Sequence, residues 1–293
     1  MAHRACGRME LFMKTRVISS LIGLVVLILV LLMFNTIVLN IAVAVISLIA
    51  VYELLCATGC RQYRVLFFLS MTFAALVPFF PVRFVAQNLM VICYVYVLAV
   101  FLLLLKTHEH LRVEQVAISV MCSLLIPFSL TTLVYQRDSH GATLGIFYVL
   151  ISLGSAWLSD TGAYFAGRAF GRRKLAPQIS PKKTVEGAIG GAVFAAFTML
   201  FVAWLYALMV SYVGYAMDVF YLRLLCMMPA LTAVSILGDL SASVIKRQFG
   251  VKDYGSIMPG HGGVMDRFDS ALTVAPLVYL ISQWIPLAQL VVK

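Results

Sequence analysis

The chain has 293 residues, of which 62% are hydrophobic and 12% are charged, and its formal net charge is +10. An average soluble domain has about 25% charged residues, and disorder needs low hydrophobicity, so this composition excludes both an ordinary soluble enzyme and a disordered chain. The length suffices for about nine membrane crossings of about 20 residues each, with short loops between them.

Uncharged stretches follow one another along the chain and predict an all-α, polytopic integral membrane protein with about nine transmembrane helices. The first stretch is too long for a signal peptide and lacks a small-residue cleavage site, so we expect it to be retained. The stretch 17–52 divides into two helices at a turn near Asn35. The other expected spans are 65–82, 84–105, 115–136, 139–159, 187–217, 224–245, which only Asp239 interrupts, and 270–292.

Basic residues predict the orientation of these spans. With nine spans and the amino terminus inside, 18 of the 22 Lys and Arg residues fall in the segments 1–16, 59–64, 106–114, 166–183 and 246–269. Lys and Arg collect in cytoplasmic loops of membrane proteins. We therefore expect a cytoplasmic amino terminus and an external carboxyl terminus, and the surplus of positive charge does not indicate nucleic acid.

The two halves of the chain differ in character. Residues 1–140 contain plain hydrophobic spans, about five of them, whereas residues 141–293 place acids, bases and glycines at membrane edges and include the loops 166–183 and 246–269. The sequence therefore predicts an N-terminal region of transmembrane helices and a C-terminal catalytic region. The six cysteines have no metal-ligand spacing, and we interpret them as buried apolar residues.

Acidic residues in or beside membrane spans are costly, so each is a candidate functional residue. The candidates are Glu53, Asp160, Glu186, Asp239, Asp266 and Asp269. For Glu53 we favour a simpler interpretation, in which the side chain reaches the interface or pairs with Arg61 or Arg64. The remaining acids lie near two groups of cations.

The loop 166–183 and the residues after it contain six cations, several glycines and the segment Ser180-Pro181-Lys182-Lys183-Thr184. Glycines allow close backbone approach, and a helix amino end supplies oriented N–H groups, so this segment fits an anion-binding site. The alternative is that the loop is basic only because it is cytoplasmic.

The densest group of polar residues extends from Gly238 to Asp269. Helical spacing places Asp239, Ser243 and Lys246 on one face, and a Pro-Gly-His-Gly-Gly loop follows before Asp266 and Asp269. Carboxylates beside cations suggest Mg²⁺ bridging to a polyphosphate. An ion-coupled transporter could also use an intramembrane Asp and Lys, but it has no evident need for this loop.

At these residues the sequence resembles the phosphatidate cytidylyltransferases, also called CDP-diacylglycerol synthases. The family pattern covers the segment 243–269 and is matched in register. The matching positions are Ser243, Lys246, Arg247, Lys252, Asp253, Pro259, His261, Gly262, Gly263, Asp266, Arg267 and Asp269. The segments 159–164 and 180–187 are also similar to the family, whereas the segment 1–140 resembles it in hydropathy alone.

The resemblance implies an all-helical, dimeric, Mg²⁺-dependent membrane enzyme whose site opens to the cytosol. Its partners would be CTP, phosphatidic acid and the bilayer, with a bacterial-type inner (plasma) membrane as its location. Its reaction would join CTP to phosphatidic acid and give CDP-diacylglycerol and pyrophosphate. The alternative within enzymes is a CTP-dependent transferase for another membrane lipid phosphate.

Site roles follow from this resemblance as expectations. Asp239 and Asp266 would hold one or two Mg²⁺ ions, and Asp239, Lys246, Asp266 and Asp269 would be catalytic. His261 would either donate to a backbone carbonyl or contact a substrate phosphate, and Ser180 or Thr184 would either cap a helix or contact phosphate. The expected substrate-binding residues are Asp160, Ser180, Lys182, Lys183, Thr184, Ser243, Arg247, Lys252, His261, Gly262, Gly263 and Arg267.

Overall fold

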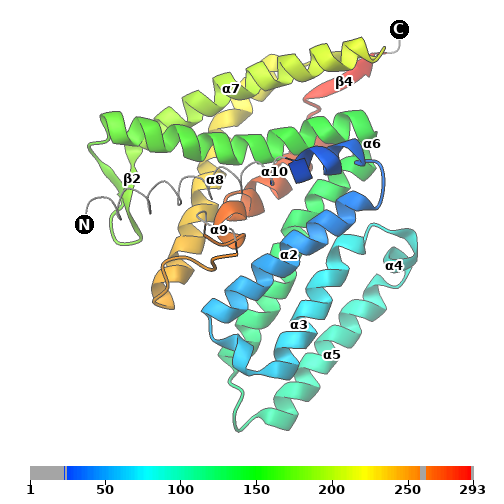
Figure 1. The fold of residues 1–293 in the computed structure, drawn as a ribbon, viewed down its shortest axis with the longest axis vertical. Coiled ribbons are helices and arrows are strands. Elements are labelled where there is room, and N and C mark those ends of the chain that lie inside the picture. The colour runs from blue at the N-terminus through cyan, green and yellow to red at the C-terminus, as the bar shows by residue number, and fades with distance from the viewer. Residues whose placement is uncertain (1–22, 24, 258–261, 292–293) are drawn as a thin grey trace, which may run out of the picture. The chain divides into compact units, whose positions relative to one another are not determined.

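The fold is given by a computed structural model, which describes residues 23, 25–257 and 262–291. Most of this part of the chain is helical (Figure 1). Short 3₁₀ turns cover Cys60–Gln62 and Val77–Phe79. The helices and strands are α2 (Val38–Ala57), α3 (Arg64–Leu76), α4 (Arg83–Gln87), α5 (Leu89–Thr107), α6 (Val113–Phe170), β1 (Lys174–Ala176), β2 (Ser180–Thr184), α7 (Val185–Tyr212), β3 (Ala216–Val219), α8 (Tyr221–Gln248), α9 (Met265–Phe268), α10 (Ala271–Trp284) and β4 (Ala288–Val291).

Five of the described helices, namely α2, α5, α6, α7 and α8, are long and apolar enough to cross a membrane. The prediction of an integral membrane protein is therefore supported, whereas the count of nine spans is not confirmed. Helices α3 and α10 have 13 and 14 residues. At 1.5 Å per residue they extend only about 20 Å, which is less than the hydrocarbon thickness of about 30 Å. The expected first span begins outside the described residues.

Two expected spans, 115–136 and 139–159, lie in the element α6, which consists of two helices that meet at a kink. The charges that separate them in the sequence belong to Arg137 and Asp138, whose side chains form an ion pair with an Nε–Oδ1 distance of 2.7 Å. The helix is interrupted at Gly141, where φ is 75° and ψ is 179°. A positive φ favours glycine, so the break falls at a residue that tolerates it.

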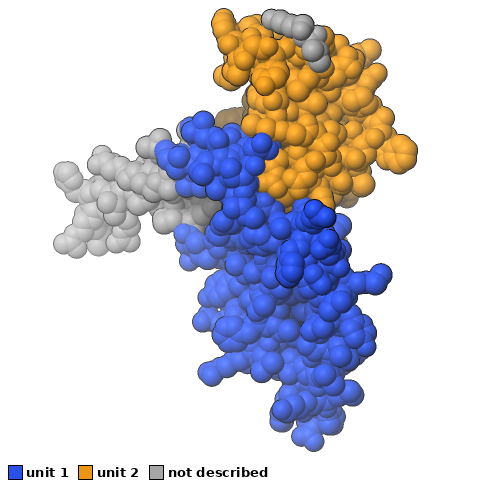
Figure 2. Space-filling view, turned by 90° about the vertical axis from the view of Figure 1, so that its right-hand side faces the viewer, with its two compact units in different colours: residues 1–128, 249–267 blue, residues 129–248, 268–293 orange. Residues whose placement is uncertain are grey.

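The chain forms two compact units, shown in different colours in Figure 2. Unit 1 comprises residues 1–128 and 249–267, and unit 2 comprises residues 129–248 and 268–293. The sequence had suggested a division near residue 140 with the whole motif region on the C-terminal side. The structure instead groups the motif segment 249–267 with the N-terminal helices.

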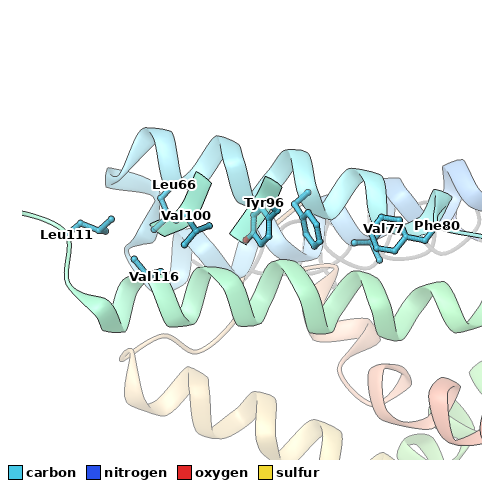
Figure 3. Packing of buried hydrophobic residues seen from close by; sticks show 8 residues of the cluster. Leu66, Val77, Phe80, Tyr96, Val100, Leu111 and Val116 are labelled. Carbon is cyan, nitrogen blue, oxygen red and sulfur yellow. The ribbon is translucent and has the colours of Figure 1, made fainter. Parts of the chain in front are cut away.

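In unit 1, α3 packs against both α2 and α5, and short connections make these neighbours antiparallel (Figure 1). Buried apolar side chains from α3, α5 and the start of α6 form its core, seen from close by in Figure 3. The rings of Phe73 and Tyr96 stack with centroids 4.0 Å apart. The Tyr96 hydroxyl lies 2.7 Å from Ser123 Oγ, so its polar end is satisfied inside the core.

In unit 2, α8 packs against both α7 and α10. Two short antiparallel sheets, β1–β2 and β3–β4, correct the expectation of a purely α-helical chain. Helix α7 ends at Tyr212, shortly before Gly214 with φ 94°, so the expected span to residue 217 is shorter. Extended backbone at Ile285, followed by Pro286, ends α10, and the residues after it pair with β3 as β4.

Candidate active site

Charged side chains from four elements meet in unit 2. Lys183 at the end of β2 forms an ion pair with Asp239 of α8, through Lys183 Nζ and Asp239 Oδ2. Asp160 of α6 accepts a 2.8 Å hydrogen bond from the hydroxyl of Ser270. Asp269, just before α10, is buried and accepts a 2.8 Å hydrogen bond from the Ser270 amide. We call Asp160, Asp239 and Asp269 the acidic cluster.

The acidic cluster brings together three of the acids that the sequence singled out. Burial, followed by the negative charges of Asp239 and Asp160, raises the pKa of Asp269 to about 7, although the Ser270 amide and Lys246 oppose the shift. Like charges that share a site disfavour ionisation. Asp269 is therefore only partly ionised near neutral pH, and a bound cation would favour its ionised form.

The helix α8 confirms the predicted shared face of Asp239, Ser243 and Lys246, because it is helical from residue 221 to 248. Gly238 beside them has a packing role, since a Cβ there would lie 2.6 Å from the Asp269 carbonyl oxygen. Thr273 also donates from its hydroxyl to Val234 O at 2.8 Å. These close contacts fix the backbone of Asp269 against α8.

The oxygen ligands of the acidic cluster are of the type that Mg²⁺ prefers. Among the described residues, however, no three His, Cys, Asp or Glu side chains already stand in an arrangement for a metal ion. At Asp239 the positive charge is supplied by Lys183, whose side chain is 23% exposed. The carboxylate oxygens therefore fit a divalent cation, and Lys183 pairs with Asp239 in this structure.

The predicted anion-binding loop contains the β1–β2 hairpin, and part of it has a structural role. Thr184 Oγ1 accepts a 3.1 Å hydrogen bond from the Gly187 amide, so the capping alternative for Thr184 is confirmed. The Glu186 carboxylate accepts from the amides of Arg172 and Arg173, the former at 3.0 Å. Two backbone donors that could have served a phosphate are therefore used by the protein itself.

Other predicted substrate-binding residues of unit 2 lie close to this hairpin. The Arg247 side chain is exposed, and its Nε donates to Ile179 O at 3.4 Å. Lys182 is exposed on β2, and Ser180 pairs with Ala176 across the hairpin. Because β2 carries both Lys182 and Lys183, the hairpin places one lysine in solvent and the other at Asp239.

The described motif residues up to Arg267, namely 249–257 and 262–267, belong to unit 1, and some of their backbone amides donate to carboxylates. Asp266 Oδ2 accepts hydrogen bonds from the amides of Tyr254, at 2.9 Å, and Gly263, at 3.2 Å. The amide of Gly263, which was predicted to bind substrate, thus serves Asp266. Lys252 and Arg267 are exposed, and His261 lies outside the described residues.

Glu53 was misjudged from the sequence. Its side chain is 2% exposed and neither reaches solvent nor pairs with Arg61 or Arg64; its Oε2 accepts a 2.9 Å hydrogen bond from the Met265 amide. Arg61 instead lies over the ring of Tyr52, 5.7 Å from its centroid. The signal available in the sequence was an acid within an otherwise apolar helix, which marks a functional hypothesis by default.

Comparison with known proteins assigns the chain to a family. The profile of the cytidylyltransferase family matches residues 14–285. The chain belongs to the cytidylyltransferase family.

Among individual proteins of the cytidylyltransferase family, the phosphatidate cytidylyltransferase of Bacillus subtilis (strain 168) is 44% identical over 144 residues, which are 49% of each chain. A protein of the same name from Haemophilus influenzae is 40% identical over 157 residues, 53% of this chain and 52% of the relative. The chain thus spans about half the length of the curated relatives it matches.

Proposed function

We propose that this chain transfers the cytidylyl group of CTP to phosphatidic acid and so makes CDP-diacylglycerol and pyrophosphate for phospholipid synthesis. The observation that carries the proposal is the largely shielded acidic cluster, with Lys183 and Lys246 beside it, in a member of the cytidylyltransferase family. Relatives named for this reaction support it. The long apolar helices fit a lipid substrate.

The reaction needs positioning and positive charge more than proton transfer. An oxygen of the lipid phosphate attacks the α-phosphorus of CTP, and the bond from that phosphorus to the β-phosphate oxygen breaks and releases pyrophosphate. A phosphate monoester has a second pKa of about 6, so its attacking oxygen is already ionised near neutral pH. Catalysis then consists of bringing two anions together and stabilising their charge.

The cations on the hairpin and at the end of α8 suit this task. Lys183 on β2 and Lys246 on α8 lie at the acidic cluster. The adjacent residues on the same elements, Lys182 and Arg247, are exposed. We propose that these four residues, with Ser180 and Ser243, bind the phosphates. Lys252, His261, Gly262 and Arg267 keep their predicted roles in substrate binding.

We propose Mg²⁺ as the cofactor, held by Asp239 together with Asp160 and Asp269, with Asp266 as the further ligand predicted from the motif. When bound, Mg²⁺ would neutralise charge on the phosphate oxygens. The carboxylate oxygens of the acidic cluster support a cation there. Lys183 would leave Asp239 when Mg²⁺ arrives and would then be available to a phosphate.

We further propose that the enzyme is a homodimer in a bacterial-type inner membrane, with its amino terminus and its active site on the cytoplasmic side. The bacterial relatives support the location, and the distribution of Lys and Arg supports the orientation. CTP would enter from water, while the acyl chains of phosphatidic acid would remain in the bilayer.

The test is pyrophosphate release by the purified full chain in detergent, with CTP, Mg²⁺ and phosphatidic acid. We expect release to require all three. Asp239→Asn should lower turnover at least about a hundredfold, since it removes charge from the centre of the site. The matched control is Asp218→Asn on β3, where the aspartate is exposed and should be neutral. Wild-type turnover by Asp239→Asn would refute the metal assignment.

A panel of lipid phosphates separates the proposed substrate from the alternative. Phosphatidic acid, a polyprenyl phosphate and an isoprenoid ether lipid phosphate would each be offered with CTP. Preference for phosphatidic acid supports the proposal, and preference for either of the others replaces it with a CTP-dependent transferase of another lipid. Failure of all three to support pyrophosphate release would reject the nucleotidyl transfer itself.

A further inference from the structure

Glu53 joins the N-terminal helices to the motif segment within unit 1. It lies near the carboxyl end of α2, far before the motif loop in the sequence, and it is 2% exposed. Its Oε2 accepts a 2.9 Å hydrogen bond from the Met265 amide, and the adjacent amide of Val264 also donates to this carboxylate. A buried carboxylate that accepts backbone N–H groups makes strong, charge-assisted hydrogen bonds.

Two glycines of the motif segment enclose this carboxylate. A Cβ at Gly263 would lie 2.5 Å from Glu53 Oε2, and a Cβ at Gly255 would overlap Glu53 Oε1. Neither glycine has a positive φ, unlike Gly262 with φ 85°. The two residues of the Gly-Gly pair therefore serve different purposes: Gly262 permits the turn, and Gly263 makes room for Glu53.

A second carboxylate, that of Asp266, also accepts backbone hydrogen bonds from this segment. Asp266 accepts from the amides of Tyr254 and Gly263, while Glu53 accepts from the amide of Met265, immediately before Asp266. The backbone donors at both ends of the loop are thus directed at the protein's own acids. Their use by Glu53 and Asp266 means that these three amides hold the described ends of the segment rather than bind a phosphate.

We propose that Glu53 is a positioning residue, which holds the segment 263–265 on α2 and thereby orients Asp266. The consequence for turnover rests on the proposed function, whereas the contact itself does not. This gives the N-terminal helices a part in the site beyond crossing the membrane. Glu53 Oε1 has no hydrogen-bond partner among the described residues, so one oxygen suffices for the contact with Met265.

Backbone hydrogen exchange of the full chain in detergent tests the contact without any substrate. In Glu53→Leu the Met265 amide loses its acceptor, and exchange in peptides covering 262–268 should accelerate about tenfold or more. Glu53→Gln retains an acceptor oxygen and should exchange within about threefold of wild type. Glu114→Leu, a change at an exposed glutamate on α6 in unit 1, is the matched control and should leave these peptides unchanged.

If Glu53→Leu does not fold, a substitution at Gly263 tests the same contact. Gly263→Ala should disturb this segment, because its methyl group would lie 2.5 Å from Glu53 Oε2 and 2.8 Å from the Gly255 backbone nitrogen. Adding Glu53→Asp shortens the acid and should restore part of the protection in the double variant. Wild-type exchange in Gly263→Ala would overturn the proposal, as would wild-type exchange in a folded Glu53→Leu variant.

Steady-state kinetics then test the effect on Asp266. We expect kcat for pyrophosphate release to fall about tenfold or more in Glu53→Leu, with the KM for CTP changed less than about threefold and with rescue by Glu53→Gln. An equal loss in Glu53→Gln and Glu53→Leu would refute positioning through the hydrogen bond. If the wild-type chain releases no pyrophosphate, the proposed function is wrong. The hydrogen-exchange results then decide by themselves whether Glu53 holds this segment.

Discussion

At the scale of single residues, Asp269 illustrates how the site differs from an ordinary surface. Burial and the neighbouring charge of Asp239 raise the pKa of Asp269 to about 7, compared with about 3.9 for an unperturbed aspartate. Between these values the folded state binds more protons than the unfolded state. The contribution of Asp269 to stability therefore falls as pH rises from about 4 to about 7.

Removal of this charge should stabilise the metal-free protein. We expect Asp269→Asn to raise the thermal midpoint in detergent and chelator at pH 8 by a few degrees and to have little effect at pH 4.5, because the asparagine oxygen still accepts from Ser270. Unfolding followed at both pH values is the measurement. A lower midpoint at pH 8 than wild type would contradict the cause assigned to the pKa. Activity should be lost in the same variant, since Asp269 belongs to the acidic cluster.

Lys183 and Glu53 show how residue type alone leaves a role open. Lys183 was predicted to bind anions and lies instead at Asp239, which was predicted to bind metal. Glu53 had been interpreted as an interfacial side chain and is buried against the motif loop. In both cases the partner is distant in sequence, and no local pattern specifies it.

At the scale of elements, the start of α7 depends on a cap. Thr184 is extended, its hydroxyl accepts from the Gly187 amide, and Gly167, Gly171 and Gly187 crowd around that hydroxyl. A capping hydroxyl contributes about 1 kcal/mol to helix stability. The cap also sets the direction in which β2 presents Lys183, so it links the hairpin to the acidic cluster.

The cap gives a prediction with a conservative control. Thr184→Ala should lower the free energy of unfolding by about 1 kcal/mol, whereas Thr184→Ser retains the hydroxyl and should lose much less. Reversible unfolding in mixed micelles would measure both. An equal loss in the two variants would show that the methyl group packed among the glycines, and not the hydroxyl, stabilises this helix start.

Helix boundaries depended on signals of unequal strength. The long apolar stretches predicted α2, α5, α7 and α8, because about 20 apolar residues in a row have few alternatives. The division between the two expected spans within α6 is confirmed, because the backbone is non-helical at Gly141, a few residues after the charged pair Arg137 and Asp138. The short strands β3 and β4 were missed because they pair with one another across the whole of α8 and α10, which lie between them in the sequence.

At the scale of the whole molecule, orientation in the membrane can be tested through α7 alone. Its 28 residues extend about 42 Å, enough to separate its two ends across a bilayer. In a background with the six cysteines replaced by serine, Gln178→Cys on the hairpin and Ser211→Cys at the far end would each be offered an impermeant thiol reagent. Both positions are exposed.

We expect the Ser211→Cys variant to be labelled in intact cells and the Gln178→Cys variant only after the membrane is opened. The expectation follows from the excess of Lys and Arg in 166–183. The reverse pattern would invert the proposed topology and would put the acidic cluster on the external side, away from CTP. Labelling of both variants in intact cells would show that α7 does not cross the membrane.

The sequence by itself determined the class of the protein and its family. Composition requires a membrane protein, and the spacing of polar residues from 238 to 269 carries the family resemblance, because both depend on residues that are near one another in the chain. The tertiary structure decided which charges meet. In the folded chain Lys183 pairs with Asp239, and Glu53 accepts from the Met265 amide. These partners are far apart in the sequence, so only tertiary packing brings them together.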